Sequence, residues 1–425
     1  MKQRTLRAFS MLLAAVLLCI ACNFAAFMID TPDMREHAWQ GALMLGEQQG
    51  TPQTIGGFMS AQLDNFTAVL ILKTAAYVGD ETLMQKAFGG YRVDMPAEPG
   101  QSEWDAFCNY EFGQNSPTGG LSYSRYRHGY TLPLRLLLCV FNLANLQMLL
   151  YFAQLALLFA VLALMAGRGL KPLIPGFFLA YFLLMPFSTS VCLQYIPVTM
   201  LMLLACCAVL LWDAQISRLV GMPAFFALLG LLTNYFDLLT FPLVSLGFPL
   251  VLLLALRLQR GDGFAAMFMT TAACGICWAL GYGGMWALKW LLNAAAFGPG
   301  MLYGIFSQIT QRVSSNSDEG SFSRVSVILR NLDVLLSKAS YLLLIGATGL
   351  VTLCASARRA VRGGLRFHTG SLMLLVVAAV PFVWYFVMAN HSFDHTYFTY
   401  RNLTVSILAG FAFLTCCLKE SGDMP

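Results

Sequence analysis

Apolar runs long enough to cross a lipid bilayer recur from one end of this chain to the other. The first covers residues 7–29, and later runs include Leu143 to Met165, Phe264 to Trp290 and Ser371 to Ala389. A membrane span needs about 20 mostly apolar residues, so the chain carries enough apolar sequence for many crossings. Only 11% of its residues are charged, against roughly 25% in soluble domains. The sequence therefore predicts an all-α polytopic membrane protein and excludes a water-soluble fold.

The cationic residues indicate which ends of the spans face the cytoplasm. Among the short loops, those on one predicted side carry nearly all of the Lys and Arg, whereas the short outer turns carry only Arg401. The residues predicted to be cytoplasmic are Arg168, Lys171, Arg218, Arg257, Arg260, Arg358, Arg359, Arg362 and Arg366. Short loops rich in Lys and Arg stay inside. We expect roughly ten transmembrane helices in a cell membrane, with both termini cytoplasmic. The net charge of +5 follows from this pattern, so we expect no nucleic-acid partner.

The chain is expected to form one integral membrane domain over residues 1–425. A first span at 7–29 leads into an extracytoplasmic loop at 30–142, which is followed by a helical bundle at 143–292, a second extracytoplasmic segment at 293–338 and C-terminal spans at 339–425. Three segments of the first loop are apolar but too short to span, which is typical of surface helices: Met34 to Gly46, Phe66 to Val78 and Gly129 to Phe141. Two long apolar stretches must fold back, near 188–197 and near Asp237.

Polar clusters from distant parts of the chain are predicted to lie on the outer face. The candidate catalytic acids are Asp30, Asp33 and Asp64, and the candidate substrate-binding residues are Arg125, Arg127, His128, Asp237, His391, His395 and Arg401. Each cluster also has a structural interpretation. Asp33 and Asp64 suit helix N-caps, and the run from Tyr123 to Tyr130 suits the aromatic and cationic belt at the headgroup level. The turn from His391 to Arg401 holds more ionisable groups than a chain reversal needs.

The cysteines predict packing rather than metal or redox chemistry. Most of the 12 Cys lie inside apolar runs, and the one CxxC, Cys274 to Cys277, has no second ligand pair near it. Structural zinc sites need four such ligands. We therefore expect Cys274 and Cys277 to be packed rather than metal-bound, whereas a divalent metal elsewhere in the site stays possible.

An outer face of this kind suits transfer of a sugar from a lipid carrier. An acid near the membrane surface can act as general base on an acceptor hydroxyl, and Arg and His can hold a phosphate. A polyprenyl-phosphate-linked sugar presents its phosphate at this depth. The predicted partners are the lipid bilayer, this donor, and an extracytoplasmic acceptor such as a cell-wall glycan, a lipid or a protein.

The order of elements resembles the GT-C superfamily of membrane glycosyltransferases. A basic start, one span, a large outer loop opening with an acid, surface helices and a bundle of short-looped spans are shared, and the segments 32–37 and 45–52 are similar to the loop that carries the catalytic acid in that superfamily. The resemblance places Asp33 in that role, but Met34 stands where a second acid is usual, which leaves Asp30 and Asp64 as rivals.

Uncharacterised bacterial multi-span proteins thought to share the fold are more similar still. The matching segments are 63–67, 123–130, 281–290 and 398–401, which favours Asp64 and the run from Arg125 to His128. The resemblance leaves the sugar, the acceptor and a role for a divalent metal open.

Two other functions fit the same residues. A transporter or flippase for a lipid-linked or anionic solute would use the cationic groups for binding alone. Such a protein is expected to carry ionisable or helix-breaking residues near mid-membrane, and the apolar runs are almost bare of them, which favours the enzyme. An assembly protein without catalysis is the third alternative.

Overall fold

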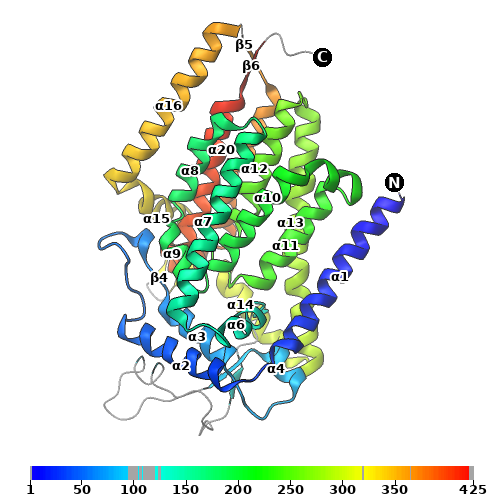
Figure 1. Cartoon of the computed structure of the whole chain (residues 1–425), viewed down its shortest axis with the longest axis vertical. Coiled ribbons are helices and arrows are strands. Elements are labelled where there is room, and N and C mark those ends of the chain that lie inside the picture. Colours follow the sequence, from blue (N-terminus) through cyan, green and yellow to red (C-terminus); the bar gives the residue numbers. More distant parts are fainter. Residues whose placement is uncertain are drawn as a thin grey trace.

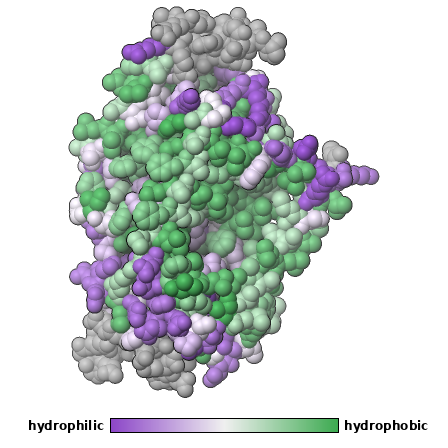
Figure 2. Space-filling model, in the orientation of Figure 1, coloured by the Kyte–Doolittle hydropathy of each residue, from purple (hydrophilic) through white to green (hydrophobic). Residues whose placement is uncertain are grey.

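The chain folds into a bundle of helices, most of which run along one axis (Figure 1). The structure, a computed structural model, describes residues 2–93, 104, 108, 120–122, 126–317, 320–363 and 365–420. Among them, six helices are long and apolar enough to cross a membrane: α1 (Lys2–Ala26), α7 (Leu143–Gly167), α10 (Ile196–Leu219), α13 (Phe264–Phe297), α16 (Ala339–Gly363) and α17 (Leu372–Val387). A hydrophobic zone covers the middle of the molecule, and hydrophilic residues gather above and below it (Figure 2). The protein is thus an all-α membrane protein.

Shorter apolar helices complete the centre of the bundle. They are α8 (Ile174–Phe182), α9 (Pro186–Val191), α11 (Met222–Phe236), α12 (Leu243–Gln259) and α20 (Leu403–Cys416). Helix α12 is buried except at Arg257 and Gln259, because α10, α11, α13, α17 and α20 pack around it. A helix that is apolar on every side is stable only when it is enclosed in this way.

Two helices of the bundle approach closely because each offers a glycine. A Cβ at Gly230 in α11 would lie 2.0 Å from the carbonyl oxygen of Trp278, and one at Gly281 in α13 would lie 2.0 Å from that of Ala227. Small residues let membrane helices pack backbone to backbone. This contact fixes α13 against α11 and, with it, the turn that follows α11.

Short elements gather at the end of the bundle away from the two chain termini (Figure 1). From the first loop these are α2 (Pro32–Glu47), η1 (Met59–Ala61), α3 (Asn65–Ala75), α4 (Leu83–Gly89), the β1–β2 hairpin pair (Tyr91–Val93 and Gly120–Ser122) and α6 (Thr131–Leu138). From later segments they are α14 (Gly300–Val313), β3 (Asn316–Ser317), β4 (Gly320–Ser321), α15 (Arg324–Leu336), α18 (Ala389–Asp394), α19 (Thr396–Thr399) and η4 (Tyr400–Asn402). The opposite end carries η2 (Lys171–Leu173), η3 (Thr369–Ser371) and the paired strands β5 (Leu365–Phe367) and β6 (Leu418–Glu420).

Several sequence predictions are confirmed at the level of single elements. Helix α7 begins at Leu143, and the apolar stretch after Met222 breaks at Asp237, which is the C-cap of α11. Asp64 is the N-cap of α3 and accepts a hydrogen bond from the Thr67 amide at 2.8 Å.

Three features differ from the predictions. Thr31, not Asp33, caps α2, with Pro32 at the first helical position, where its missing N–H is harmless. Helix α3 is buried along nearly its whole length, because α2 and α6 cover it, so it does not lie along a membrane surface. The chain also breaks between α8 and α9, where Met185 has a positive φ of 60°.

Candidate functional site

Asp64 is buried, whereas the two other candidate catalytic acids, Asp30 and Asp33, are exposed. The Asp64 side chain is 6% exposed. Its Oδ1 accepts the Thr67 amide, and its Oδ2 accepts three donors: the Thr67 hydroxyl at 2.8 Å, the Gln194 amide at 2.7 Å and the Tyr397 hydroxyl at 3.1 Å. Four hydrogen bonds satisfy the buried carboxylate oxygens. The acid is therefore held in one position by three separate parts of the chain.

The two distant partners of Asp64 come from irregular segments of the bundle. Gln194 lies in the turn between α9 and α10, and Tyr397 lies in α19, in the stretch that joins α17 to α20. Burial, with the neighbouring Asp64 carboxylate, raises the pKa of Tyr397, so its hydroxyl keeps its proton and acts as the donor. The polar turn that the sequence analysis singled out thus reaches Asp64 through a tyrosine.

Arg401 lies beside this cluster, but its guanidinium donates hydrogen bonds to backbone carbonyls. Its Nε, Nη1 and Nη2 donate to the carbonyl oxygens of Leu184, Tyr397 and Ser60 at 2.9, 3.0 and 2.9 Å. Its guanidinium carbon lies 4.5 Å from the ring centroid of Tyr195, and the side chain is fully buried. Arg401 therefore ties η1, the break after α8 and α19 together, directly behind the Tyr397 contact with Asp64.

His391 and His395 form a second polar group in the same segment. Their ring centroids lie 4.9 Å apart, and the Arg312 guanidinium contacts His391 Nδ1 at 2.8 Å and His395 Nε2 at 3.4 Å. Burial and the charge of Arg312 lower the pKa of His395 to about 4. His395 is thus neutral at pH 7 and can accept a hydrogen bond from the arginine. His395 also packs against Tyr397, with ring centroids 6.2 Å apart, which connects the histidines to Asp64.

Asp237 occupies a buried turn that lies against both polar groups. Its carboxylate accepts the Thr240 amide at 3.0 Å and the Thr240 hydroxyl at 2.5 Å, and burial raises its pKa to about 6. Two residues further on, the Leu239 carbonyl contacts His391 Nε2 at 2.6 Å. The turn therefore supports the histidine pair, while the Asp237 carboxylate itself stays bound within its own turn.

The other two candidate acids lie apart from Asp64. Asp30 is half exposed and forms an ion pair with Arg35 at 2.5 Å. Asp33 is exposed in the first turn of α2. The other end of α2 faces Asp64, since Asn65 Nδ2 donates to the Leu45 carbonyl, and twelve residues of helix separate Asp33 from Leu45, about 18 Å along the axis. The structure does not bring Asp30 or Asp33 into the Asp64 cluster.

The run before α6 packs against the C-terminal end of α11. The Gly129 amide donates to the Tyr235 carbonyl at 3.1 Å, and a Cβ on Gly129 would lie 2.5 Å from the Tyr235 ring, so only glycine fits. His128 contacts the Tyr130 hydroxyl at 2.7 Å, and Arg127 is 1% exposed. Arg125 lies outside the described residues.

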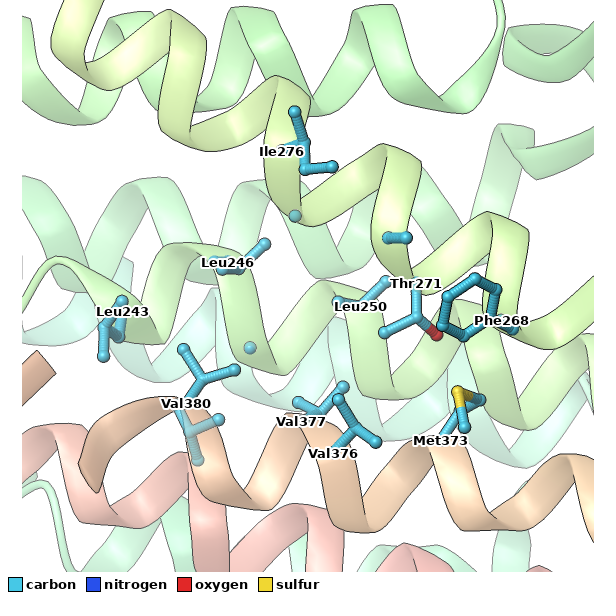
Figure 3. A pocket seen from close by; sticks show the side chains of 14 residues that line it. Leu243, Leu246, Leu250, Phe268, Thr271, Ile276, Met373, Val376, Val377 and Val380 are labelled. Atoms are coloured by element: carbon cyan, nitrogen blue, oxygen red, sulfur yellow. The ribbon is translucent and has the colours of Figure 1, made fainter. Parts of the chain in front are cut away.

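Two apolar pockets open between helices of the bundle. One, of about 290 Å³, has Tyr130 from the run before α6, Ile71 from α3 and Leu193, the neighbour of Gln194, in its wall. It therefore lies between the Asp64 cluster and the Tyr130 region. The other, of about 320 Å³, lies between α12, α13, α17 and α20, and its wall includes Leu250, Phe268 and Val377 (Figure 3).

Sequence reasoning missed Gln194, Arg312 and Tyr397. Each is an ordinary residue in its local sequence and gains a role only through contacts with distant segments. Pro186 was a usable signal for the break before α9, because the residue before a proline avoids the α region. Within the described part of the chain, no group of three or more His, Cys, Asp and Glu side chains is placed to hold a metal ion.

The chain was compared with protein-family models, with curated proteins and with solved structures, and none of them matches it. The fold and the site define the class, an all-α membrane protein with a buried polar cluster at one end of its bundle.

Proposed function

We propose that this protein is a membrane glycosyltransferase of the GT-C type, which moves a sugar from a polyprenyl-phosphate carrier to an extracytoplasmic acceptor. The observation that carries the proposal is the Asp64 cluster. Tyr397 links the Asp64 carboxylate to His395, which lies with His391 against Arg312. An apolar pocket suited to a lipid chain has Leu193, the neighbour of Gln194, in its wall. These are the groups that sugar transfer from a lipid phosphate needs.

Asp64 is proposed as the general base. It would take the proton of the acceptor hydroxyl as that oxygen attacks the anomeric carbon of the sugar, while the bond from this carbon to the phosphate oxygen breaks and the lipid phosphate leaves. Both Asp64 oxygens already accept hydrogen bonds, so the acceptor must take the place of one donor. The Tyr397 hydroxyl makes the longest of these contacts, at 3.1 Å, and is the one we expect the acceptor to replace.

The leaving phosphate needs positive charge. Arg312 is linked to Asp64 through His395 and Tyr397, and its guanidinium contacts imidazoles rather than backbone carbonyls. A neutral His395 beside it can pass a proton to a leaving oxygen only after it is itself protonated, so we assign His395 to orientation of Arg312 and not to acid catalysis. The apolar pocket of about 290 Å³ would hold the first isoprene units of the carrier.

The membrane arrangement proposed for this function has ten crossings. The six long helices supply six of them, and α8 with α9, α11, α12 and α20 supply the rest. Arg168 and Arg260 lie at the C-terminal ends of α7 and α12, and both pair with Asp213, at the end of the bundle opposite to Asp64. The positive-inside rule then puts both termini in the cytoplasm and the Asp64 cluster outside.

The direct test is an assay of the purified protein in lipid nanodiscs. Polyprenyl-phosphate sugars are added with a panel of hydroxyl acceptors, and release of polyprenyl phosphate is measured. Acceptor-dependent release supports the proposal. Binding of the donor without release under every acceptor contradicts it.

A transporter is the second candidate, and the break between α8 and α9 favours it. The chain leaves the helix at Leu183 to Met185, where the carbonyl oxygens of Leu183 and Leu184 point to Tyr400 and Arg401. Discontinuous helices form solute sites in many transporters. Here protein donors already satisfy those carbonyls, which weakens this candidate. Accumulation of labelled polyprenyl-phosphate sugar across a proteoliposome membrane without hydrolysis or transfer would establish it.

A further inference from the structure

Among the residues whose burial the structure describes, three arginines are almost completely buried, and one of them differs from the others. Arg127, Arg135 and Arg401 are each at most 1% exposed. Arg135 donates to the carbonyl oxygens of Ala26, Ile29 and Tyr77, and Arg401 also binds three carbonyls. Arg127 has no hydrogen-bond partner on any of its three guanidinium nitrogens within the described part of the chain.

Arg127 nevertheless keeps its charge and its position. Burial lowers its pKa to about 10, which is still far above neutral pH. Its backbone carbonyl accepts the Asn23 side-chain amide, which also donates to Ala87, and the next residues are fixed by the contact of Gly129 with Tyr235. A buried, charged guanidinium without a partner costs several kcal/mol, so a counter-ion is expected at this place.

A second cation lies beside it. Lys289 of α13 is fully buried, and its ammonium group donates to the Phe88 carbonyl at the end of α4. The Asn23 amide donates to the carbonyls of both Ala87 and Arg127, so the end of α4 that Lys289 contacts adjoins the Arg127 backbone. The ion pairs of the described residues involve neither side chain. Two buried basic side chains from different elements therefore meet the end of α4 with no acidic partner among the described residues.

The pair lies at the depth of lipid headgroups in the proposed arrangement. Lys289 is 25 residues from the start of α13 at Phe264, about 38 Å along the axis, which exceeds the roughly 30 Å of a bilayer core. Trp286 and Trp290 flank Lys289 in the sequence and stack on each other, with ring centroids 5.7 Å apart. Tryptophans are enriched at the level of the lipid headgroups. Helix α4 contacts both α1 and α13, and only the last turns of α1 contain buried residues. Helix α4 lies at the lower end of α1 (Figure 1).

We propose that Arg127 and Lys289 bind a phosphate group between α1, α4 and α13, at the outer boundary of the membrane. A guanidinium and an ammonium together match the charge and the oxygens of a phosphate monoester or diester. The phosphate comes either from a membrane lipid or from solution. If the phosphate belongs to the sugar donor, this site rests on the proposed function. If the phosphate comes from another lipid or from solution, the site does not depend on that function.

The test uses the full-length protein and two sources of phosphate. In nanodiscs of phosphatidylcholine, polyprenyl phosphate is compared with polyprenol, which lacks only the phosphate, and retention is read by native mass spectrometry. In detergent, inorganic phosphate is compared with chloride at equal ionic strength, and thermal unfolding is measured. We expect retention of polyprenyl phosphate but not polyprenol if the source is a lipid, and a rise in unfolding temperature with inorganic phosphate if the source is in solution. No effect of phosphate in either arm overturns the proposal.

Variants locate the binding. Arg127→Gln and Lys289→Gln should each weaken phosphate binding by about tenfold or more, Arg127→Lys should retain part of it, and Arg218→Gln, at an exposed position, should leave it unchanged. Equal binding by all variants contradicts the assignment. If the glutamine variants do not fold, Arg127→Lys decides: weaker phosphate binding than the wild type supports the site, and unchanged binding contradicts it. Phosphate binding without turnover would contradict the proposed glycosyltransferase activity but support the phosphate site. If Arg127→Gln retains both turnover and full phosphate binding, the phosphate site is contradicted and the proposed activity is not.

Discussion

The Tyr397 hydroxyl donates a hydrogen bond to Oδ2 of Asp64 at 3.1 Å, although 333 positions separate the two residues in the chain. The contact joins the first loop to the segment before the last helix. It explains how polar residues that look unrelated in the sequence come to share one place.

Removal of the Tyr397 hydroxyl should weaken the fold slightly and spare catalysis. Tyr397→Phe deletes one of the four hydrogen bonds to Asp64, and a buried hydrogen bond to a charged group contributes about 1.5–3 kcal/mol. If the acceptor replaces this donor, turnover should fall by less than about threefold while unfolding in detergent shifts measurably. Tyr303→Phe, at an 83% exposed position, is the control. A loss of turnover as deep as that of an Asp64 variant would show that Tyr397 acts in the reaction itself.

The Asp237 carboxyl should make stability depend on pH. Burial raises its pKa from 3.8 to about 6, so the folded state holds this proton more tightly than the unfolded state does. Its contribution to stability is complete below pH 3.8 and is lost as the pH rises through about 6, about 3 kcal/mol in all. Asp237→Asn keeps an oxygen for Thr240 and removes the charge. Its unfolding temperature should equal that of the wild type near about pH 3.5 and exceed it near about pH 7.5; a parallel pH profile for both proteins would contradict this.

Arg401 should be irreplaceable by lysine for stability. Its three bonds to carbonyl oxygens diverge from one planar group, and an ammonium cannot reproduce that geometry. Arg401→Lys should cost about 2–4 kcal/mol of unfolding free energy, whereas Arg218→Lys at an exposed position should cost almost nothing. Unfolding by denaturant in mixed micelles measures both. A tolerant Arg401→Lys would mean that the three carbonyls do not depend on the guanidinium.

The contact between α11 and α13 should reject a single methyl group. Gly230→Ala puts a Cβ 2.0 Å from the Trp278 carbonyl oxygen, so the helices must separate, at a cost of about 1–3 kcal/mol. Gly283→Ala changes the same kind of residue in α13 where no atom lies within 4 Å, and it should be neutral or slightly stabilising. The difference between the two unfolding temperatures is the measurement. Equal unfolding temperatures for Gly230→Ala and Gly283→Ala would contradict the close packing of α11 against α13.

The sequence predicts local features of this fold well because they depend on nearby residues. The start of α7 at Leu143, the break at Asp237 and the capping of α3 by Asp64 follow from hydropathy and capping chemistry within a few positions. The membrane class follows from composition. Each of these is decided by the properties of a short window.

The site could be predicted only in part, because long-range packing decides which polar groups meet. Sequence order favoured Asp33, directly after the first span, but the length of α2 keeps it away from the Asp64 cluster. Arg401 looked like a phosphate ligand, yet its donors go to backbone carbonyls. Lys289 had a signal that was not used: a lone lysine at the end of an apolar run is costly in a membrane unless it has a purpose.

The comparison of two acid variants tests the central claim most directly. Asp64→Asn and Asp33→Asn are assayed in nanodiscs for acceptor-dependent release of polyprenyl phosphate from its sugar conjugate, with folding checked by size-exclusion chromatography. Asp64→Asn keeps an oxygen for the Thr67 amide but loses the base, so its turnover should fall by about 10²-fold or more, while Asp33→Asn should keep nearly all of it. Full turnover of Asp64→Asn, or loss of turnover in Asp33→Asn alone, would contradict the assignment of Asp64 as the catalytic acid.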